Sequence, residues 1–157
     1  MKRLIIIVAL MMVTFCAKAQ FWNGVEIGGT IQYANHRGKS NLGVDLRATK
    51  RVCEYSRIRA VGGINALIPN GTDRYSTAMV GITADLLPAY IFADYGMSFN
   101  PSAKQPVGMA FDCGVGLHFD IAERWHLFSE LGIDRINSGK LWQSTPSVKA
   151  GVMYQVK

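Results

Sequence analysis

Residues 107–120, V-G-M-A-F-D-C-G-V-G-L-H-F-D, decide the fold. The odd-numbered positions, from Val107 to Phe119, are apolar, and the even-numbered positions, from Gly108 to Asp120, are small or polar. Because successive side chains of a β-strand point to opposite faces, this alternation predicts one long strand with an apolar face and a small-polar face. In a helix, the two sets of residues would mix on every side.

The small-polar face of this strand carries Gly108, Gly114 and Gly116. Glycine weakens the interior of a strand and often marks a position where other groups come close to the backbone. A strand face in water more commonly carries charged or hydroxylated side chains. The glycines therefore predict that the polar face is the crowded interior of a barrel and that the apolar face points outward to lipid.

The same two-faced pattern occurs at residues 25–33, 41–49, 57–66, 77–86, 89–99, 125–134 and 148–156. Together with residues 107–120, these segments predict an all-β protein, an eight-stranded antiparallel up-and-down transmembrane β-barrel. Every predicted strand has a glycine on its polar face: Gly28, Gly43, Gly63, Gly81, Gly96, Gly108, Gly132 and Gly151.

Charged side chains share the polar faces with these glycines. An eight-stranded barrel has an interior that side chains can just fill, and buried charges must pair with one another. We therefore predict a plugged polar interior and no open pore. The predicted interior charges are Glu26, Asp45, Arg47, Arg57, Arg59, Asp112, Glu130 and Lys149.

The N-terminus has the pattern of a cleaved secretory signal. Lys2 and Arg3 form a basic start, residues 4–15 form an apolar run, and Ala17 and Ala19 are the small residues before the cleavage position. We expect residues 1–19 to be a signal peptide, cleaved after Ala19, and residues 20–157 to form one outer-membrane β-barrel domain.

Two alternatives for the N-terminal segment fit less well. The apolar run is shorter than the roughly 18–20 residues that a membrane-spanning helix needs. Lipid attachment at Cys16 would have to follow Phe15, a bulky residue where that processing prefers a small one. Removal of residues 1–19 takes away three cations and no acid, which lowers the formal net charge from +6 to +3. This mild charge, on an exported chain, predicts no nucleic-acid partner.

The predicted connections alternate between short ones, at residues 49–54, 86–89 and 120–124, and longer ones, at residues 35–40, 69–74, 100–106 and 137–147. In outer-membrane barrels the short turns are periplasmic and the longer loops are external. We therefore expect the protein to lie in the outer membrane of a Gram-negative cell envelope. Aromatic residues expected at outward positions near strand ends match the two interfacial girdles of such barrels: Phe21, Phe119, Trp125 and Tyr154 at one end, Tyr33 and Phe99 at the other.

The mature chain as a whole resembles the small eight-stranded outer-membrane barrels of the OmpX and OmpA transmembrane-domain type. Residues 114–134, G-V-G-L-H-F-D-I-A-E-R-W-H-L-F-S-E-L-G-I-D, are similar to the strand, short turn and strand unit of that class. The last strand is similar to the signal read by the barrel-assembly machinery, although the chain ends in Lys157 and not at an aromatic residue. The matching positions are Lys149, Gly151, Tyr154 and Val156. The resemblance implies a monomer whose partners are outer-membrane lipid, lipopolysaccharide and the assembly machinery.

His118 and His126 lie on inward faces beside one predicted turn, with Asp120 and Glu130 nearby. Such a group could form a metal or acid–base cluster. We favour a hydrogen-bonded cap at the end of the barrel, and we predict no catalytic residue, no metal and no cofactor. A lipid acyl hydrolase that uses His126, Ser129 and Glu130 is an alternative, but the alternation points His126 inward and Ser129 outward.

The sequence thus predicts a non-enzymatic outer-membrane barrel with a surface, structural or adhesion-type role. Two alternatives stay open: a barrel enzyme that hydrolyses or transfers lipid acyl chains, and a soluble exported lipocalin-like ligand binder, whose apolar face would point inward. Cys53 and Cys113 are expected to be free thiols. Basic residues of the longer connections are candidates for contact with lipopolysaccharide phosphates: Arg37, Lys39, Arg74, Lys104, Arg135 and Lys140.

Overall fold

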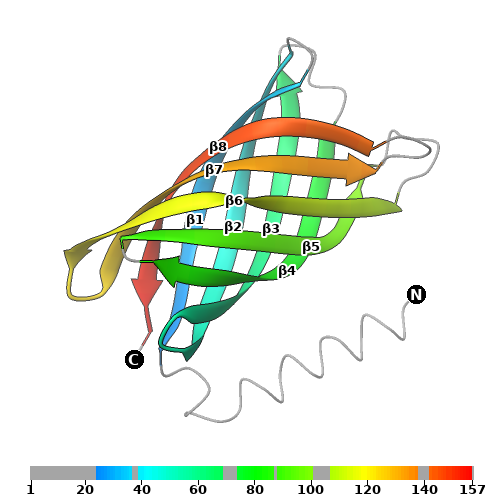
Figure 1. Cartoon of the computed structure of the whole chain (residues 1–157). Coiled ribbons are helices and arrows are strands. Elements are labelled where there is room, and N and C mark those ends of the chain that lie inside the picture. Colours follow the sequence, from blue (N-terminus) through cyan, green and yellow to red (C-terminus); the bar gives the residue numbers. More distant parts are fainter. Residues whose placement is uncertain are drawn as a thin grey trace.

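The chain forms a closed antiparallel β-barrel in a computed structural model (Figure 1). The structure describes residues 24–36, 39–68, 74–86, 88–100, 107–137 and 142–156. Each strand pairs with its neighbour in sequence, and β8 pairs with β1 to close the barrel. This confirms the predicted all-β, up-and-down architecture. The predicted signal peptide and Phe21 lie outside the described residues.

The strands are regular and long, as a wall that spans a membrane requires. Their bounds are β1 Val25–His36, β2 Lys39–Cys53, β3 Ser56–Ile68, β4 Arg74–Leu86, β5 Ala89–Phe99, β6 Val107–Ala122, β7 Trp125–Asn137 and β8 Trp142–Gln155. No helix in the described part of the chain is long and apolar enough to cross a membrane.

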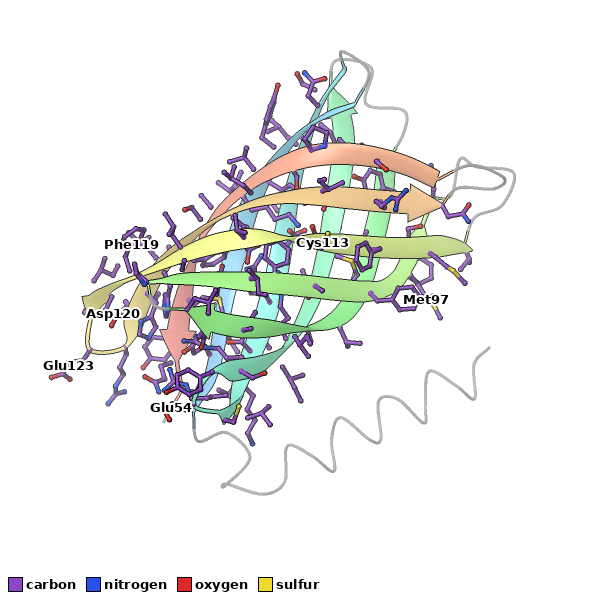
Figure 2. All side chains as sticks on the ribbon, viewed as in Figure 1. Glu54, Met97, Cys113, Phe119, Asp120 and Glu123 are labelled. Atoms are coloured by element: carbon purple, nitrogen blue, oxygen red, sulfur yellow. The ribbon has the colours of Figure 1, made fainter. Side chains whose placement is uncertain are left out.

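The barrel has an apolar outside and a polar inside. On the outer face, Leu46 is 76% exposed and Val115 53% exposed, whereas Arg59 and Lys149, on inward faces, are each 1% exposed. Figure 2 shows Phe119 and Met97 on the outside of the wall. Because this polarity matches hydrocarbon outside and charge inside, it is opposite to what a lipocalin-like carrier requires, and that alternative is wrong.

Two turns are tighter than the sequence predicts. Strand β2 continues to Cys53, so the first short connection is Glu54 and Tyr55 only, and β6 continues to Ala122 before the turn at Glu123 and Arg124. A register shift precedes each turn, between Arg51 and Cys53 and between Asp120 and Ala122. An extra residue accommodated in this way lets pairing continue almost to the turn.

At the end of the barrel away from these turns, β7 and β8 are also longer than predicted. Strand β8 begins at Trp142 and not at Val148, so the predicted connection over residues 137–147 shrinks to residues 138–141. The extension includes Pro146, which pairs with Ile133 on β7. Pairing of β8 with β1 reaches only Ser147, so Pro146 has a neighbouring strand on one side, an edge-like position where proline is tolerated.

The two ends of the barrel differ. We call the end with the turns at Glu54 and Tyr55, at residues 87–88 and at Glu123 and Arg124 the short-turn end; the described C-terminus lies there as well (Figure 1). The opposite, long-loop end has connections at residues 37–38, 69–73, 100–106 and 138–141. The first of these is shorter than predicted because β1 and β2 pair as far as His36 and Lys39.

Candidate functional site: the barrel interior and its short-turn mouth

Glycines on the inner face make room for charged side chains. A Cβ atom added at Gly63 would lie 1.8 Å from Oδ1 of Asp45, and one added at Gly81 would lie 2.1 Å from Oδ1 of Asp94. Real Cβ atoms do not approach other atoms so closely. A side chain at either position would therefore displace the carboxylate that the neighbouring strand sends across it, and at Gly81 it would also meet the backbone oxygen of Ala93, at 2.2 Å.

The centre of the interior is organised around Glu130, which is 1% exposed. Arg47 donates two hydrogen bonds to its carboxylate, at 2.6 and 3.0 Å, and Nη1 of Arg59 donates another at 2.9 Å. The hydroxyl of Tyr90 also donates to Oε1 of Glu130, at 2.7 Å. Two cations and a phenol thus surround one buried carboxylate, which is the arrangement that makes burial of a charge tolerable.

Aromatic rings complete the packing around the arginines. The guanidinium carbon of Arg47 lies 4.2 Å from the ring centroid of Phe128, and that of Arg59 lies 4.5 Å from the centroid of Phe92. Nε of Arg59 also lies 2.9 Å from Oδ1 of Asp94. Each guanidinium therefore meets a carboxylate at its edge and an aromatic face above its plane.

Further ion pairs lie on either side of this centre. Toward the long-loop end, Nζ of Lys149 contacts Asp112 and lies 3.3 Å from Oδ1 of Asp134, which Gln32 also contacts. Toward the short-turn end, Arg57 lies 2.8 Å from a carboxylate oxygen of Glu26 and 2.9 Å from Oδ2 of Asp85. The charges thus form a ladder along the barrel axis.

The eight charges selected from the sequence all lie on the inner face of the wall, with Glu26 half-buried at the short-turn end and the other seven buried. Four further ionisable groups that the sequence pattern did not single out are also buried there: Asp85, Tyr90, Asp94 and Asp134. The alternation of inward and outward positions could have identified these residues. In β5 this alternation is hard to recognise in the sequence, because the aromatic residues Tyr90 and Phe92 also point inward.

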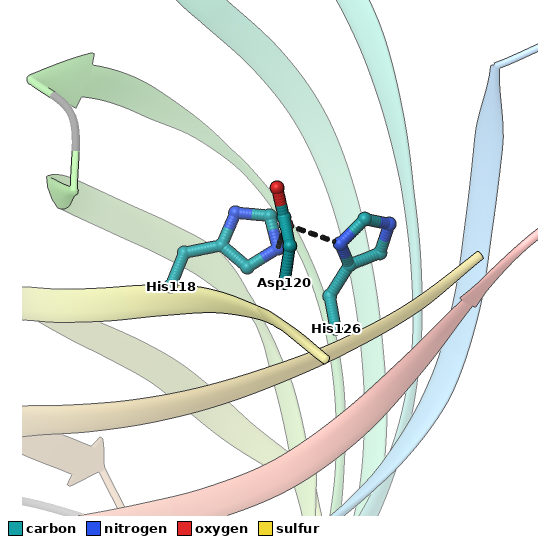
Figure 3. Close-up of side chains that lie close together, drawn as sticks. All are labelled: His118, Asp120 and His126. Atoms are coloured by element: carbon teal, nitrogen blue, oxygen red, sulfur yellow. Dashed lines mark hydrogen bonds and ion pairs between the residues drawn. The ribbon is translucent and has the colours of Figure 1, made fainter. Parts of the chain in front are cut away.

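A second cluster lies at the short-turn mouth, where β6 and β7 meet. Asp120 lies between the two imidazoles of His118 and His126 (Figure 3). Its Oδ1 is 2.6 Å from Nδ1 of His126 and 3.8 Å from Nε2 of His118, and the ring centroids are 4.8 Å apart. The three converge because Asp120 and His126 are cross-strand partners and His118 is two residues earlier on the same face.

The hydrogen bond of Asp120 fixes the tautomer of His126. A carboxylate accepts, so Nδ1 of His126 carries the donated proton. The other ring nitrogen, Nε2, is buried and has no hydrogen-bond partner among the residues that the structure describes. The imidazole of His126 is therefore held from one side only.

The cavity at the mouth is larger than the two cavities found farther inside the barrel. A cavity of about 580 Å³ at the mouth is lined by the three residues of the cluster and by Glu26, Arg51, Arg57 and Gln155, among others. Farther in, two cavities between the described side chains measure only about 40 and 10 Å³. A single water molecule needs about 10–15 Å³ of such space, so these two cavities together have room for only a few water molecules.

The sequence predicts Glu130 near the two histidines, and this is wrong, because Arg47 and Arg59 hold Glu130 deeper in the barrel. His126 is buried inside, whereas Ser129 lines a hollow on the outer wall together with Leu127 and Ala150. His126, Ser129 and Glu130 thus do not converge, and the structure does not assemble the constellation of the hydrolase alternative.

The residues of the assembly-signal pattern occupy different environments. Lys149 is buried in the charge ladder, and the ring of Tyr154 packs against Trp125 with centroids 5.0 Å apart. Gly151 pairs with Thr30 of β1, and the amide of Val156 donates to the carbonyl of Val25 at 2.8 Å. The role of these residues in assembly stays a prediction. Cys53 and Cys113 are free thiols, as expected.

No protein-family model matches the chain, and no curated protein matches it. The chain is, however, similar to solved structures. The crystal structure of Neisserial surface protein A is similar at 12% identity, covering 84% of this chain and 96% of that one, with a TM-score of 0.56. A structure from the de novo design of transmembrane β-barrels is similar at 16% identity, covering 85% of this chain and 97% of that one, with a TM-score of 0.53.

The fold is that of a small transmembrane β-barrel. The similarity covers 84–85% of the chain, and it confirms the resemblance to small eight-stranded outer-membrane barrels at the level of fold. At these identities it carries no information about individual residues, so the charge ladder and the histidine cluster rest on the geometry of this chain alone.

Proposed function

We propose that this protein is an integral outer-membrane barrel with a closed interior and a non-enzymatic role at the cell surface, structural or adhesive. The observation that carries the proposal is the charge ladder. Side chains of Arg47, Arg59, Glu130 and Lys149 reach into the lumen and pair there, and the cavity described beside Arg47 and Arg59 measures only about 40 Å³, which supports a closed interior.

The apolar outer wall supports membrane insertion. Exposed aliphatic side chains cover every strand face that points away from the lumen, and a surface of this extent is not stable in water. The N-terminal signal pattern supports export, and the shorter turns at one end support an orientation with that end in the periplasm. Outer-membrane lipid and lipopolysaccharide are then the expected surroundings of the barrel.

Conductance in planar lipid bilayers tests the closed interior. We expect the protein, extracted from outer membranes and inserted into a bilayer, to give no steady open-channel steps under conditions where a porin gives them. A reproducible conductance of the wild-type protein would contradict a plugged interior. Release of fatty acid from outer-membrane lipid by the same preparation, lost in His126→Ala, would contradict the non-enzymatic role.

Epitope insertion tests membrane placement and orientation. A tag inserted at residues 101–106, in the longest connection of the long-loop end, is expected to bind antibody on intact cells. A tag between Glu54 and Tyr55, at the short-turn end, is expected to bind only after the outer membrane is permeabilised. The reverse labelling would overturn the orientation, and recovery of the protein in a buffer wash without detergent would overturn membrane insertion.

A further inference from the structure

We propose that His118, Asp120 and His126 form a binding site for a divalent transition-metal ion, such as Zn²⁺, at the short-turn mouth. The three potential ligand atoms, Nε2 of His118, Oδ1 of Asp120 and Nδ1 of His126, all lie within 4.8 Å of one another. Figure 3 shows the carboxylate of Asp120 between the two imidazole rings. This inference is independent of the proposed surface role.

The distances are close to those of a formed site. Zinc–ligand bonds of about 2.0–2.2 Å place neighbouring ligand atoms of a tetrahedral site about 3.4 Å apart. Oδ1 of Asp120 is 3.8 Å from His118 and 2.6 Å from His126, so shifts of less than about 1 Å would bring these two pairs to that separation. The two imidazole nitrogens lie within 4.8 Å of each other and would have to approach by at most about 1.4 Å. The side chain of Asp120 is 76% exposed and therefore free to make them.

Two imidazoles and one carboxylate are ligands that Zn²⁺ accepts readily. The cluster supplies three protein ligands and faces a cavity of about 580 Å³. The cavity gives the ion a path of entry and leaves room for water in the remaining coordination position. The strand ends, paired across β6 and β7, hold the donor residues in register without any contribution from a mobile loop.

Two cations, Arg51 and Arg57, line the same cavity, and so does the carboxylate of Glu26. Arg57 is paired with both Glu26 and Asp85, which offsets its charge. Asp120, in contrast, has no cationic side chain other than the two histidines among the ion pairs of the described residues. When both imidazoles are neutral, its carboxylate charge is uncompensated, and a bound divalent cation would compensate it.

Metal binding requires one proton to move within the imidazole of His126. In the metal-free protein the proton is on Nδ1, where Asp120 accepts it. Coordination of the metal by Nδ1 places the proton on Nε2, and the ion takes over the interaction with Oδ1. No acceptor for Nε2 is present among the described residues, so we expect the micromolar affinity of a site without that second interaction.

Calorimetric titration with zinc chloride tests the proposal on the mature, untagged protein in detergent micelles. The wild-type protein is expected to bind one Zn²⁺ per chain. His118→Ala, Asp120→Asn and His126→Ala are each expected to weaken binding about tenfold or more, because each removes a ligand. Heat-dependent migration on electrophoresis gels checks that every variant still forms the barrel.

Glu123→Gln is the matched control. Glu123 is an exposed carboxylate of the same hairpin, two residues before Trp125, and it is not part of the cluster. We expect this variant to bind Zn²⁺ as the wild type does. Absence of binding by the wild type at millimolar zinc would overturn the proposal, and so would an equal loss of affinity in Glu123→Gln, which indicates general attraction to exposed carboxylates.

Nitrogen-15 spectra of the histidine rings give an independent readout. Zinc is expected to convert His126 from the form protonated at Nδ1 to the form protonated at Nε2 and to shift the Nε2 resonance of His118. Binding with one-to-one stoichiometry that leaves both rings unchanged would place the ion elsewhere and overturn the assignment. This readout is also unaffected by any small change of stability in the variants.

Discussion

The centre of the barrel and its short-turn mouth use the same kinds of residues in opposite ways. In the centre, Glu130 is 1% exposed and accepts hydrogen bonds from Arg47, Arg59 and Tyr90. At the mouth, the side chain of Asp120 is 76% exposed, and among the described residues its ion pairs are with His118 and His126. The centre is therefore a structural part of the wall, whereas the mouth has a carboxylate and two imidazoles still able to bind something else.

The difference follows from the cost of desolvation. A carboxylate taken out of water loses several kcal/mol of hydration, and only close, well-oriented cations recover that loss. The centre satisfies the condition with two guanidinium groups, so it has no spare ligand. The mouth does not need to satisfy it, because solvent in the adjoining cavity hydrates Asp120.

The largest expected effect comes from breaking the centre. Glu130→Ala leaves Arg47 and Arg59 buried without their shared carboxylate, and we expect a loss of about 3–5 kcal/mol in the free energy of unfolding. Reversible urea unfolding in lipid vesicles, followed by tryptophan fluorescence, measures it. Glu123→Ala removes an exposed carboxylate and is expected to stay within about 0.5 kcal/mol of the wild type. Equal effects of the two variants would contradict the structural role of the centre.

The next effect tests the outer wall on one strand. Val115, in the middle of β6, and Ile121, near its end at the mouth, both point outward and are 53% and 56% exposed. We expect Val115→Arg to destabilise the barrel in lipid by about 2–4 kcal/mol and Ile121→Arg by about 0–1 kcal/mol, because the cost of a charge falls toward the interface. Similar losses for both variants in the same unfolding assay would argue against the membrane depth assigned here.

Much of the fold could be predicted because one physical constraint applies to every strand. Each strand separates lipid from a polar lumen, so the alternation seen in residues 107–120 had to recur eight times. Strand ends were predicted less well. The bulges before the turns, and the extension of β8 through Pro146, depend on which neighbouring strands are still paired at that level.

The sites were only partly predictable for a similar reason. Alternation places His118, His126 and Glu130 on one face, but it does not say that closure of the barrel brings Arg47 and Arg59 to Glu130 from 83 and 71 residues away. The cross-strand pairing of Asp120 with His126 depends on the length of the turn. Partners across a barrel are fixed by strand number and register, which no local pattern contains.

Gly28 and Gly29 are adjacent in β1, so alanine substitutions there compare the inner and outer faces of the wall at one position of the strand. The expected changes in stability are smaller than those of Glu130→Ala and Val115→Arg. A Cβ at Gly28, on the inner face, would lie 2.0 Å from the carbonyl oxygen of Val152, whereas one at Gly29, on the outer face, would lie 3.9 Å from that of Asp45. We expect Gly28→Ala to cost about 1–3 kcal/mol because the backbone of β8 must shift. Gly29→Ala is expected to stay within about 0.5 kcal/mol of the wild type. A neutral Gly28→Ala in the urea assay would show that the inner face is less crowded than described.

The smallest effect is expected at the mouth. Asp120→Asn weakens the hydrogen bond with His126, but the side chain is largely in water, so we expect a loss of only about 0.2–1 kcal/mol in metal-free protein. With saturating zinc the difference between wild type and variant should grow, because the wild type binds zinc more tightly and therefore gains more stability from it. Urea unfolding with zinc and with a chelator measures both values. If Asp120→Asn, measured with the chelator, lost as much stability as Glu130→Ala, the mouth would be a structural part of the wall like the centre. A carboxylate that serves ligand binding contributes little to the free energy of unfolding until the ligand is present.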